Sequence, residues 1–217
     1  MHHHARVLAH VLGFASLTLI TVLNLVVLEA ARAADDGWVP LFNGRDLSGW
    51  VPINVAPGTF SVRDGIIVST GIPTGLLRTE RQYENFIVEL EWRHMRSGGN
   101  AGLFVWGDGL TACGSPFARG MEVQILDNGF NANGKNEWYT THGDVFPVFG
   151  SKMTPTGRIS STGQRSFPIE ERSKSSPQWN HYRVEARDGV LRLSVNGREV
   201  TVGRDCSPRK GYLCLES

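Results

Sequence analysis

The chain has 217 residues, of which 41% are hydrophobic and 20% are charged, and its formal net charge is +1. This length and composition suffice for one domain with a buried core. A balanced chain without a cluster of basic residues gives no electrostatic reason to expect nucleic acid or an anionic membrane surface as a partner, so neither is predicted.

The first 33 residues have the pattern of a signal peptide. A basic start is followed by an uncharged apolar run over 11–28 and by an alanine-rich stretch with an A-x-A cleavage site that ends at Ala33. We therefore expect 1–33 to form a cleavable leader with a hydrophobic helix, and the protein to be exported to the periplasm or outside the cell. The apolar run is close to the minimum for a membrane span, so an uncleaved N-terminal anchor remains the alternative.

Residues 34–217 show short strands and turns. Asp64-Gly65 separates two short apolar runs, and Asp188-Gly189 and Asn196-Gly197 divide the segment from His181 onward into a three-stranded meander. Further alternating strands are predicted over 86–92, 101–106 and 121–126. Helical periodicity is not sustained in any segment of 34–217. The predicted fold class is all-β, a two-sheet antiparallel sandwich with one long irregular loop region.

The segment GMEVQIL at 120–126 has two different faces. Met121, Val123 and Ile125 share one face of a strand, and Glu122 and Gln124 share the other. We expect the apolar face to pack in the core and the polar face to line a groove for a polar ligand. The alternative is an ordinary exposed face, on which Glu122 pairs with an arginine.

The stretch 128–176 is rich in Gly, Asn, Thr, Pro and Ser. So much irregular chain inside a compact domain is usually functional, and loops at the edge of a rigid sandwich commonly carry binding groups. It contains His142, Asp144 and Lys152. We expect this loop to bring His142 and Lys152 over Glu122 and Gln124.

Three cysteines, Cys113, Cys206 and Cys214, belong to a chain that is expected to enter an oxidising compartment. Cys206 and Cys214 are close enough in sequence to close a small loop by a disulfide. The alternative is that they are buried as separate thiols.

Six segments, in this order, carry a resemblance to a known family. They are GWVPLFNGRDLSGW at 37–50, GGNAGLFVWGD at 98–108, GMEVQILD at 120–127, WN at 179–180, VNG at 195–197 and GYLCLES at 211–217. Together they resemble the 3-keto-disaccharide hydrolase family, also described as 3-keto-glucoside 1,2-lyase and 3-keto-2-hydroxyglucal hydratase domains, with a concanavalin A-like jelly roll. The resemblance implies a secreted or periplasmic enzyme over 34–217 that acts on oxidised (3-keto) sugars.

The chain departs from the family pattern at two points. Family members usually continue beyond the position of Ser217 with one more strand, so we expect 34–217 to lack the last strand of the fold. Where many members have an arginine, this chain has Trp106.

The implied chemistry needs a base, an acid and a group that stabilises an enolate. A ketone at C3 acidifies the hydrogen at C2, so a base forms an enolate that expels the group at C1, and water then adds to the resulting glucal. Glu122 is our first candidate for the base. His142 is the second candidate for the base and the first for the acid, because the usual pKa of histidine is near the working pH. Lys152 or a divalent cation would stabilise the enolate, although the sequence requires no cofactor.

Other side chains are candidates for holding the substrate or a cation. The predicted substrate-binding residues are Asn100, Gln124, Trp106, Trp138, Tyr139 and Glu216, and the predicted metal ligands are Asp127 and Asp144. Several of the candidate residues have a structural alternative. Asp127 starts an Asn-Gly turn, His142 caps a turn, Lys152 is solvated, and the aromatic residues pack in the core or at its rim.

Two other functions remain open. Glu122, Gln124 and Asp127 resemble the strand motif of laminarinase-like retaining glycosidases. Those enzymes need two carboxyl groups about 5 Å apart, whereas five residues of strand span roughly 16 Å. The fold would also suit a carbohydrate-binding module without activity. The sequence contains no signal for the oligomeric state.

Overall fold

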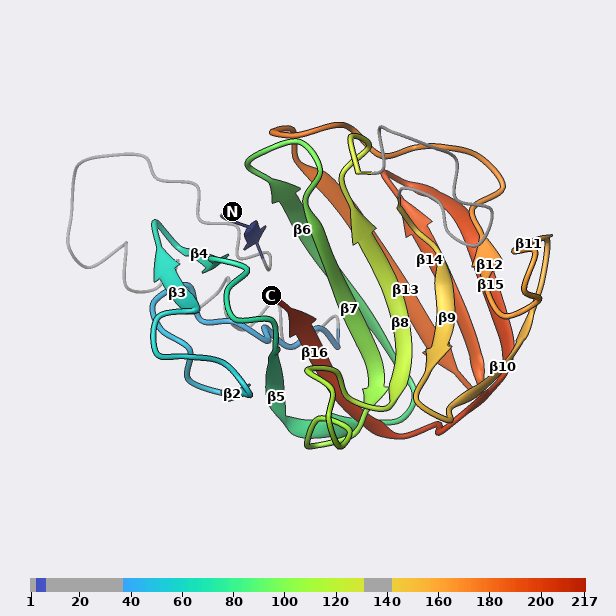
Figure 1. Ribbon diagram of the computed structural model, residues 1–217, viewed down its shortest axis with the longest axis horizontal. Coiled ribbons are helices and arrows are strands. Elements are labelled where there is room, and N and C mark those ends of the chain that lie inside the picture. The colour runs from blue at the N-terminus through green and yellow to red at the C-terminus, as the bar shows by residue number, and fades with distance from the viewer. Residues whose placement is uncertain (1–2, 7–36, 131–141) are drawn as a thin grey trace.

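The computed structural model describes residues 3–6, 37–130 and 142–217, and all the regular elements within them are β-strands (Figure 1). The strands pair antiparallel in two sheets that pack face to face, as a sandwich requires. The predicted all-β jelly-roll architecture is confirmed. Within these described ranges no helix is long and apolar enough to cross a membrane.

The first sheet has the order β10-β15-β14-β13-β6-β1-β4-β3. Its strands are β1 (His3–Arg6), β3 (Phe60–Arg63), β4 (Ile66–Ser69), β6 (Phe86–His94), β10 (Lys152–Pro155), β13 (Asn180–Arg187), β14 (Val190–Val195) and β15 (Arg198–Ser207).

The second sheet has the order β11-β12-β9-β8-β7-β16-β5-β2. Its strands are β2 (Trp50–Ile53), β5 (Leu76–Tyr83), β7 (Asn100–Gly107), β8 (Gly120–Leu126), β9 (Val145–Val148), β11 (Arg158–Ile159), β12 (Ser166–Phe167) and β16 (Gly211–Glu216).

The turns form where the sequence predicts them. Asp64, Asp188 and Asn196 each have a positive φ near 50° and are each followed by a glycine with positive φ, which is the geometry of a two-residue hairpin. The hairpin β3–β4 and the meander β13–β14–β15 are thereby confirmed. The long segment after Asn128 carries only short strands, β9 to β12, where it is described.

Strand β1 comes from the segment predicted to be a leader. It pairs with β4 on one side and with β6 on the other, so it occupies an interior position in the first sheet (Figure 1). The predicted hydrophobic helix lies outside the described residues.

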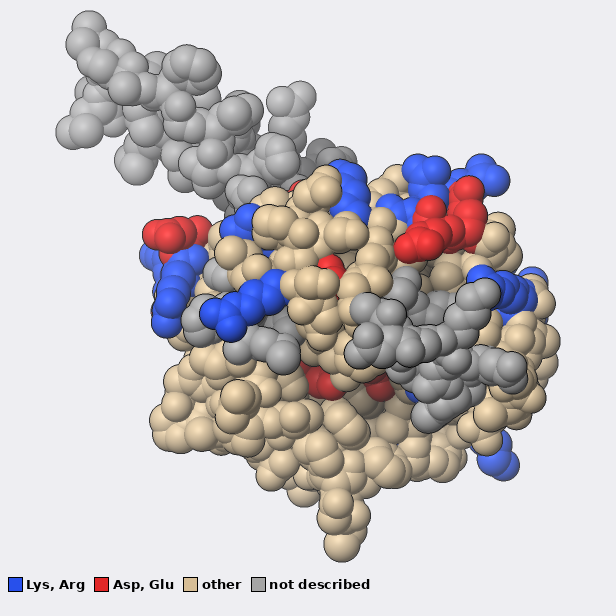
Figure 2. Space-filling model, turned by 45° about the horizontal axis from the view of Figure 1, so that its top comes forward, with Lys and Arg blue, Asp and Glu red and all other residues tan. Residues whose placement is uncertain are grey.

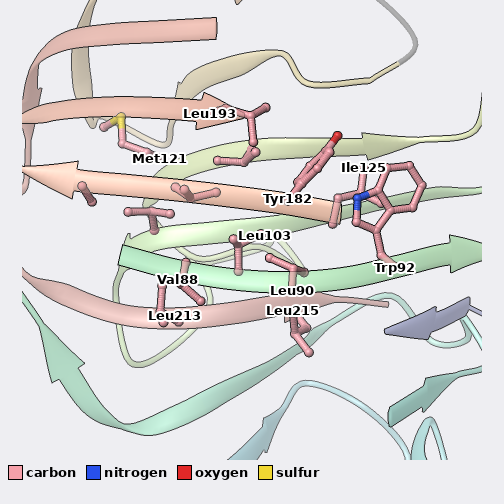
Figure 3. Close-up of a cluster of buried hydrophobic side chains, with 14 of the residues drawn as sticks. Val88, Leu90, Trp92, Leu103, Met121, Ile125, Tyr182, Leu193, Leu213 and Leu215 are labelled. Carbon is pink, nitrogen blue, oxygen red and sulfur yellow. The ribbon is translucent and has the colours of Figure 1, made fainter. Parts of the chain in front are cut away.

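The core lies between the sheets. Met121, Val123 and Ile125 are 0 to 5% exposed and belong to one large cluster of buried side chains, as the alternation predicts. Figure 3 shows Met121 and Ile125 of β8 among side chains of the opposite sheet, including Leu193, Tyr182 and Trp92. The other face of β8 is buried as well, although it carries Glu122 and Gln124.

Two sequence-based interpretations change with this core. Trp106 is not a sugar-stacking residue, because its side chain is fully buried in the core. Its indole nitrogen donates a hydrogen bond to the Glu84 carbonyl at 2.8 Å, and its φ is positive, at 54°. The cysteines form no disulfide. Cys206 lies on a strand of the first sheet and Cys214 on a strand of the second, and burial raises the pKa of each thiol to about 12.

Polar side chains of the first sheet hold the backbone of the second from the core side. The Tyr182 hydroxyl donates to the Gln124 carbonyl at 2.9 Å, and the Thr201 hydroxyl donates to the Gly143 carbonyl at 2.7 Å. A ring nitrogen of His94 lies 2.9 Å from the Ile125 carbonyl oxygen. These contacts fix β8 and the chain just before β9 relative to the first sheet.

Replacing Tyr182 by Phe tests this arrangement. The Gln124 carbonyl also accepts from the Gly143 amide, so the variant removes one hydrogen bond without leaving that carbonyl unpaired. We expect Tyr182→Phe to lower the free energy of unfolding by about 0.5–1.5 kcal/mol. Urea unfolding should show a lower midpoint at an unchanged m-value, and an unchanged midpoint would contradict the assigned contact.

Candidate functional site

The outer face of the second sheet carries a set of polar side chains on three neighbouring strands. Asn100 and Gly102 lie on β7, Glu122 and Gln124 on β8, and Glu216 on β16, with β7 in the middle. Successive side chains of a strand point to opposite faces of the sheet. Met121, Val123 and Ile125 face the core, so Glu122 and Gln124 lie on the outer face. Three segments that are far apart in sequence therefore meet at one place.

Glu122 and Glu216 are hydrogen-bonded to each other and are each only 7% exposed. Burial raises the pKa of both carboxyl groups, and for Glu122 the neighbouring Glu216 raises it further. The pKa of Glu216 rises from its usual 4.5 to about 7. Two carboxylates in contact cannot both be ionised at low cost, so the pair holds one proton near neutral pH. Figure 2 shows acidic side chains recessed in a hollow of this face.

An arginine from the long loop region completes the charges. The Arg165 guanidinium lies 3.5 Å from the centre of the Phe146 ring and 3.6 Å from an Asp144 oxygen. It acts on Glu122 by lowering that residue's pKa, whereas Asp144 raises it. Asp144 is fully buried and Arg165 nearly so. The site therefore combines a carboxyl pair that shares a proton with a cation and its counter-ion.

Gln124 and Asn100 form the polar end of the site. The Gln124 side-chain amide donates to the Asn100 side-chain oxygen at 3.0 Å and to the Ala101 carbonyl at 3.1 Å. Gln124 is thus fixed in orientation, while Asn100 is exposed at the start of β7. The sequence-based grouping of these two residues with Glu122 and Glu216 matches their positions in the structure.

The other end of the site is apolar and covered. Phe104 follows Gly102 on the same face of β7 and lies opposite Glu122 in register. With Leu76, Ala118 and Cys214 it forms a second buried cluster, and it stacks on Phe117 with ring centres 6.3 Å apart. Burial of the two carboxyl groups is the largest cause of their raised pKa values, and for Glu122 the neighbouring Glu216 adds to it.

His142 does not have the environment expected of an acid that works near neutral pH. Its ring nitrogen accepts from the backbone amides of Arg172 and Ser173 at 3.4 Å, and the side chain is buried. Burial lowers the pKa of His142 to about 4, because desolvation disfavours the charged imidazolium. His142 is therefore neutral at the pH at which we expected it to donate a proton.

Lys152 lies on the opposite sheet, contrary to our expectation. It starts the edge strand β10, is paired with Ser207 of β15, and is exposed. The cation beside Glu122 is Arg165 instead. Sequence reasoning missed Arg165 because the stretch around it carries no strand or helix pattern, and only the pairing of β12 with β9 brings it to the site.

The two predicted metal ligands lie in different environments. Asp127 accepts hydrogen bonds from the backbone amides of Gly98, Gly129 and Ser176, which lower its pKa and give it the turn-forming role that was the alternative. Asp144 faces Arg165. Among the residues that the structure describes, no group of three His, Cys, Asp or Glu side chains is placed to hold a metal ion. The candidate aromatic residues Trp138 and Tyr139 lie outside the described residues.

The carboxyl pair predicts a characteristic dependence of stability on pH. A carboxyl group whose pKa is raised in the folded state contributes stability that is fully present below its unfolded pKa and is lost as the pH rises through the folded pKa. We expect the melting temperature to fall as the pH rises from the usual glutamate value of 4.5 through about 7. Glu122→Gln removes the repulsion, so this variant should melt at a higher temperature than the wild type above that range. An identical pH dependence in both proteins would contradict the shared proton.

Comparisons with known proteins agree with this architecture. The family model described as 3-keto-alpha-glucoside-1,2-lyase-like domain matches residues 37–217. No curated protein matches the chain. Two structures described as candidate glycosyl hydrolases of Parabacteroides distasonis ATCC 8503 are similar. One is 22% identical with a TM-score of 0.62 and covers 82% of this chain and 86% of its own. The other is 21% identical with a TM-score of 0.52 and covers 77% and 90%.

The carbohydrate-binding module CBM66 from Bacillus subtilis also shares the fold, with 13% identity, a TM-score of 0.53, and coverage of 78% of this chain and 87% of that one. At these identities the likeness to solved structures shows a common jelly-roll fold. The family match extends over nearly all of the described domain, and it supports a carbohydrate-active function. The chain belongs to the family of 3-keto-alpha-glucoside-1,2-lyase-like domains.

Proposed function

We propose that this protein cleaves 3-keto-glucosides by β-elimination followed by hydration, which together amount to hydrolysis of the glycosidic bond. The observation that carries the proposal is the contact between Glu122 and Glu216, whose side chains are both buried. One ionised and one protonated carboxyl group, side by side, offer a base and an acid at the same pH. Membership of the family supports the choice of a keto-sugar as substrate.

The elimination step follows from the acidity of C2. The ionised carboxylate of the pair takes the C2 hydrogen as a proton, and the electron pair of the C2–H bond forms the enolate of the C3 ketone. The enolate collapses to a C1–C2 double bond, the C3 carbonyl reforms, and the bond from C1 to the leaving oxygen breaks. A proton held by the pair goes to the leaving oxygen. Water then adds its hydroxyl to C1 and a proton returns to C2, so no oxidant or reductant is consumed.

The short distance within the pair favours this chemistry over that of a laminarinase-like glycosidase. A retaining glycosidase holds its two carboxyl groups about 5–5.5 Å apart, and an inverting one about 6.5–9.5 Å apart, so that they act on both sides of the bond. Hydrogen-bonded carboxyl groups are closer than either distance. A contacting pair is instead suited to moving a proton between neighbouring atoms of one substrate.

Arg165 and the polar end of the site have supporting roles in this proposal. The guanidinium is the described cation next to Glu122, and a nearby fixed positive charge stabilises a developing enolate oxygen. Gln124 and Asn100 present amide groups that suit the hydroxyls of a sugar ring. The leader predicted over 1–33 supports action in the periplasm or outside the cell.

Glutamine substitutions test the carboxyl pair. Glu122→Gln and Glu216→Gln keep the shape of the side chain while removing one titrating group, and we expect each to lower kcat on a 3-keto-glucoside by about 10²–10⁴-fold. Product analysis by NMR, on both anomers of the substrate, should detect a 2-hydroxy-3-keto-glucal intermediate with the wild type.

The unoxidised glucosides serve as the matched substrates. Cleavage of these in preference to the keto-sugars would point to an ordinary glycosidase, and binding of either sugar without turnover would point to a carbohydrate-binding module. Near-normal turnover by both glutamine variants would show that the pair is not the acid–base unit.

Arg165→Gln separates the cation from the acid–base groups. We expect a lower kcat with a smaller change in KM, because the positive charge acts on the enolate that forms in the transition state. The exposed Arg187 offers a matched control, since Arg187→Gln changes the net charge by the same amount away from the site. Equal effects of the two substitutions would argue against a local role for Arg165.

A further inference from the structure

Glycine occupies the position between the two glutamates. Gly102 lies on β7, opposite Gln124 of β8, and the neighbouring Leu103 lies opposite Leu215 of β16. β7 is therefore the middle strand, and Glu122 and Glu216 extend from the strands on either side of it. Adjacent strands in a sheet are about 4.8 Å apart, so the backbones that carry the two glutamates are separated by roughly twice that distance. Their carboxyl groups can meet only by leaning over β7.

A side chain at position 102 would occupy the place where they meet. A Cβ atom built on Gly102 would lie 2.7 Å from Oε1 of Glu122 and 2.9 Å from Oε2 of Glu216. Both distances are shorter than carbon and oxygen tolerate without a shift of the carboxyl groups. The space that the glycine leaves open is filled by the two carboxyl groups themselves.

The backbone gives no other reason for a glycine at this position. Gly102 is not among the residues with positive φ, so its conformation is open to any amino acid. Glycine inside a strand weakens it, because it packs nothing and loses more conformational freedom on folding. A close approach by other groups is the remaining explanation, and here those groups are the two carboxylic acids.

We propose that Gly102 is a positioning residue, whose missing side chain lets Glu122 and Glu216 meet above β7 and work as one proton-sharing unit. The inference rests on the proposed function for its catalytic consequence. Its structural part, that contact between the carboxyl groups requires a glycine on the middle strand, is independent of the substrate.

The consequence of adding one methyl group follows from electrostatics. In Gly102→Ala the Cβ atom pushes the carboxyl groups apart and toward solvent. The repulsion between them and their desolvation both decrease, so their pKa values move down toward the usual value for glutamate. The base and the acid then cease to be available together near neutral pH.

The experiment compares three variants of the full chain with the wild type. Gly102→Ala adds the methyl group, and Glu216→Asp shortens one side chain by a methylene without adding any atom. Gly203→Ala is the matched control. It lies on β15 of the opposite sheet, and its new Cβ would meet the side chain of Met153, away from the glutamates.

The first measurement is the melting temperature as a function of pH, which needs no substrate. We expect the pH at which stability is lost to move lower in Gly102→Ala and in Glu216→Asp, and to stay in place in Gly203→Ala even if that variant melts earlier. The second measurement is the pH profile of kcat, in which we expect the two shifted variants to lose about 10²-fold or more at neutral pH.

The outcomes distinguish this inference from the proposed function. If Gly102→Ala does not fold, Glu216→Asp still tests whether the titration depends on contact. An unchanged titration in Glu216→Asp, or in a folded Gly102→Ala, would overturn the role of Gly102. If the wild type does not turn over keto-sugars but the titrations shift as expected, the carboxyl unit stands and the proposed substrate is wrong.

Discussion

The hydrogen bond between Glu122 and Glu216 is the contact on which the rest of this site depends. The two carboxyl groups would repel each other if both were ionised, and each side chain is only 7% exposed. They remain in contact because they share a proton. Such an arrangement costs stability, since burying ionisable groups is unfavourable unless they are paired and hydrogen-bonded. Proteins retain costly groups of this kind mainly at functional sites, where a shifted pKa is useful.

The sandwich keeps this unfavourable arrangement rigid. β8 is buried on both faces, with apolar side chains toward the core and the glutamate toward the site. From the core side, Tyr182 and His94 of the opposite sheet contact the carbonyls of Gln124 and Ile125. A strand whose side chains and backbone are both fixed cannot easily shift to separate the carboxyl groups. Groups held on rigid strands keep their geometry better than groups on loops.

Local pattern explains what the sequence could predict. Alternation along 120–126 correctly separates Met121 and Val123 from Glu122, and the Asp-Gly and Asn-Gly turns are correctly placed, because both signals depend on adjacent residues. The partnership of Glu122 with Glu216 and the approach of Arg165 depend on strand pairing between distant segments, which no local pattern encodes. Trp106 was misjudged for a related reason, since its burial depends on a positive φ within an otherwise regular strand.

Burial shifts the pKa values of the two kinds of titrating group considered for catalysis in opposite directions. It lowers the pKa of His142 to about 4 and raises that of Glu216 to about 7, because in both cases it disfavours the charged form. The histidine is therefore uncharged at neutral pH and has no acidic proton to donate as an imidazolium, whereas the glutamate pair holds one. Residue type alone suggests the reverse assignment, with histidine as the acid. The same desolvated sandwich that gives the domain its core therefore also decides which of its side chains can exchange a proton with a substrate.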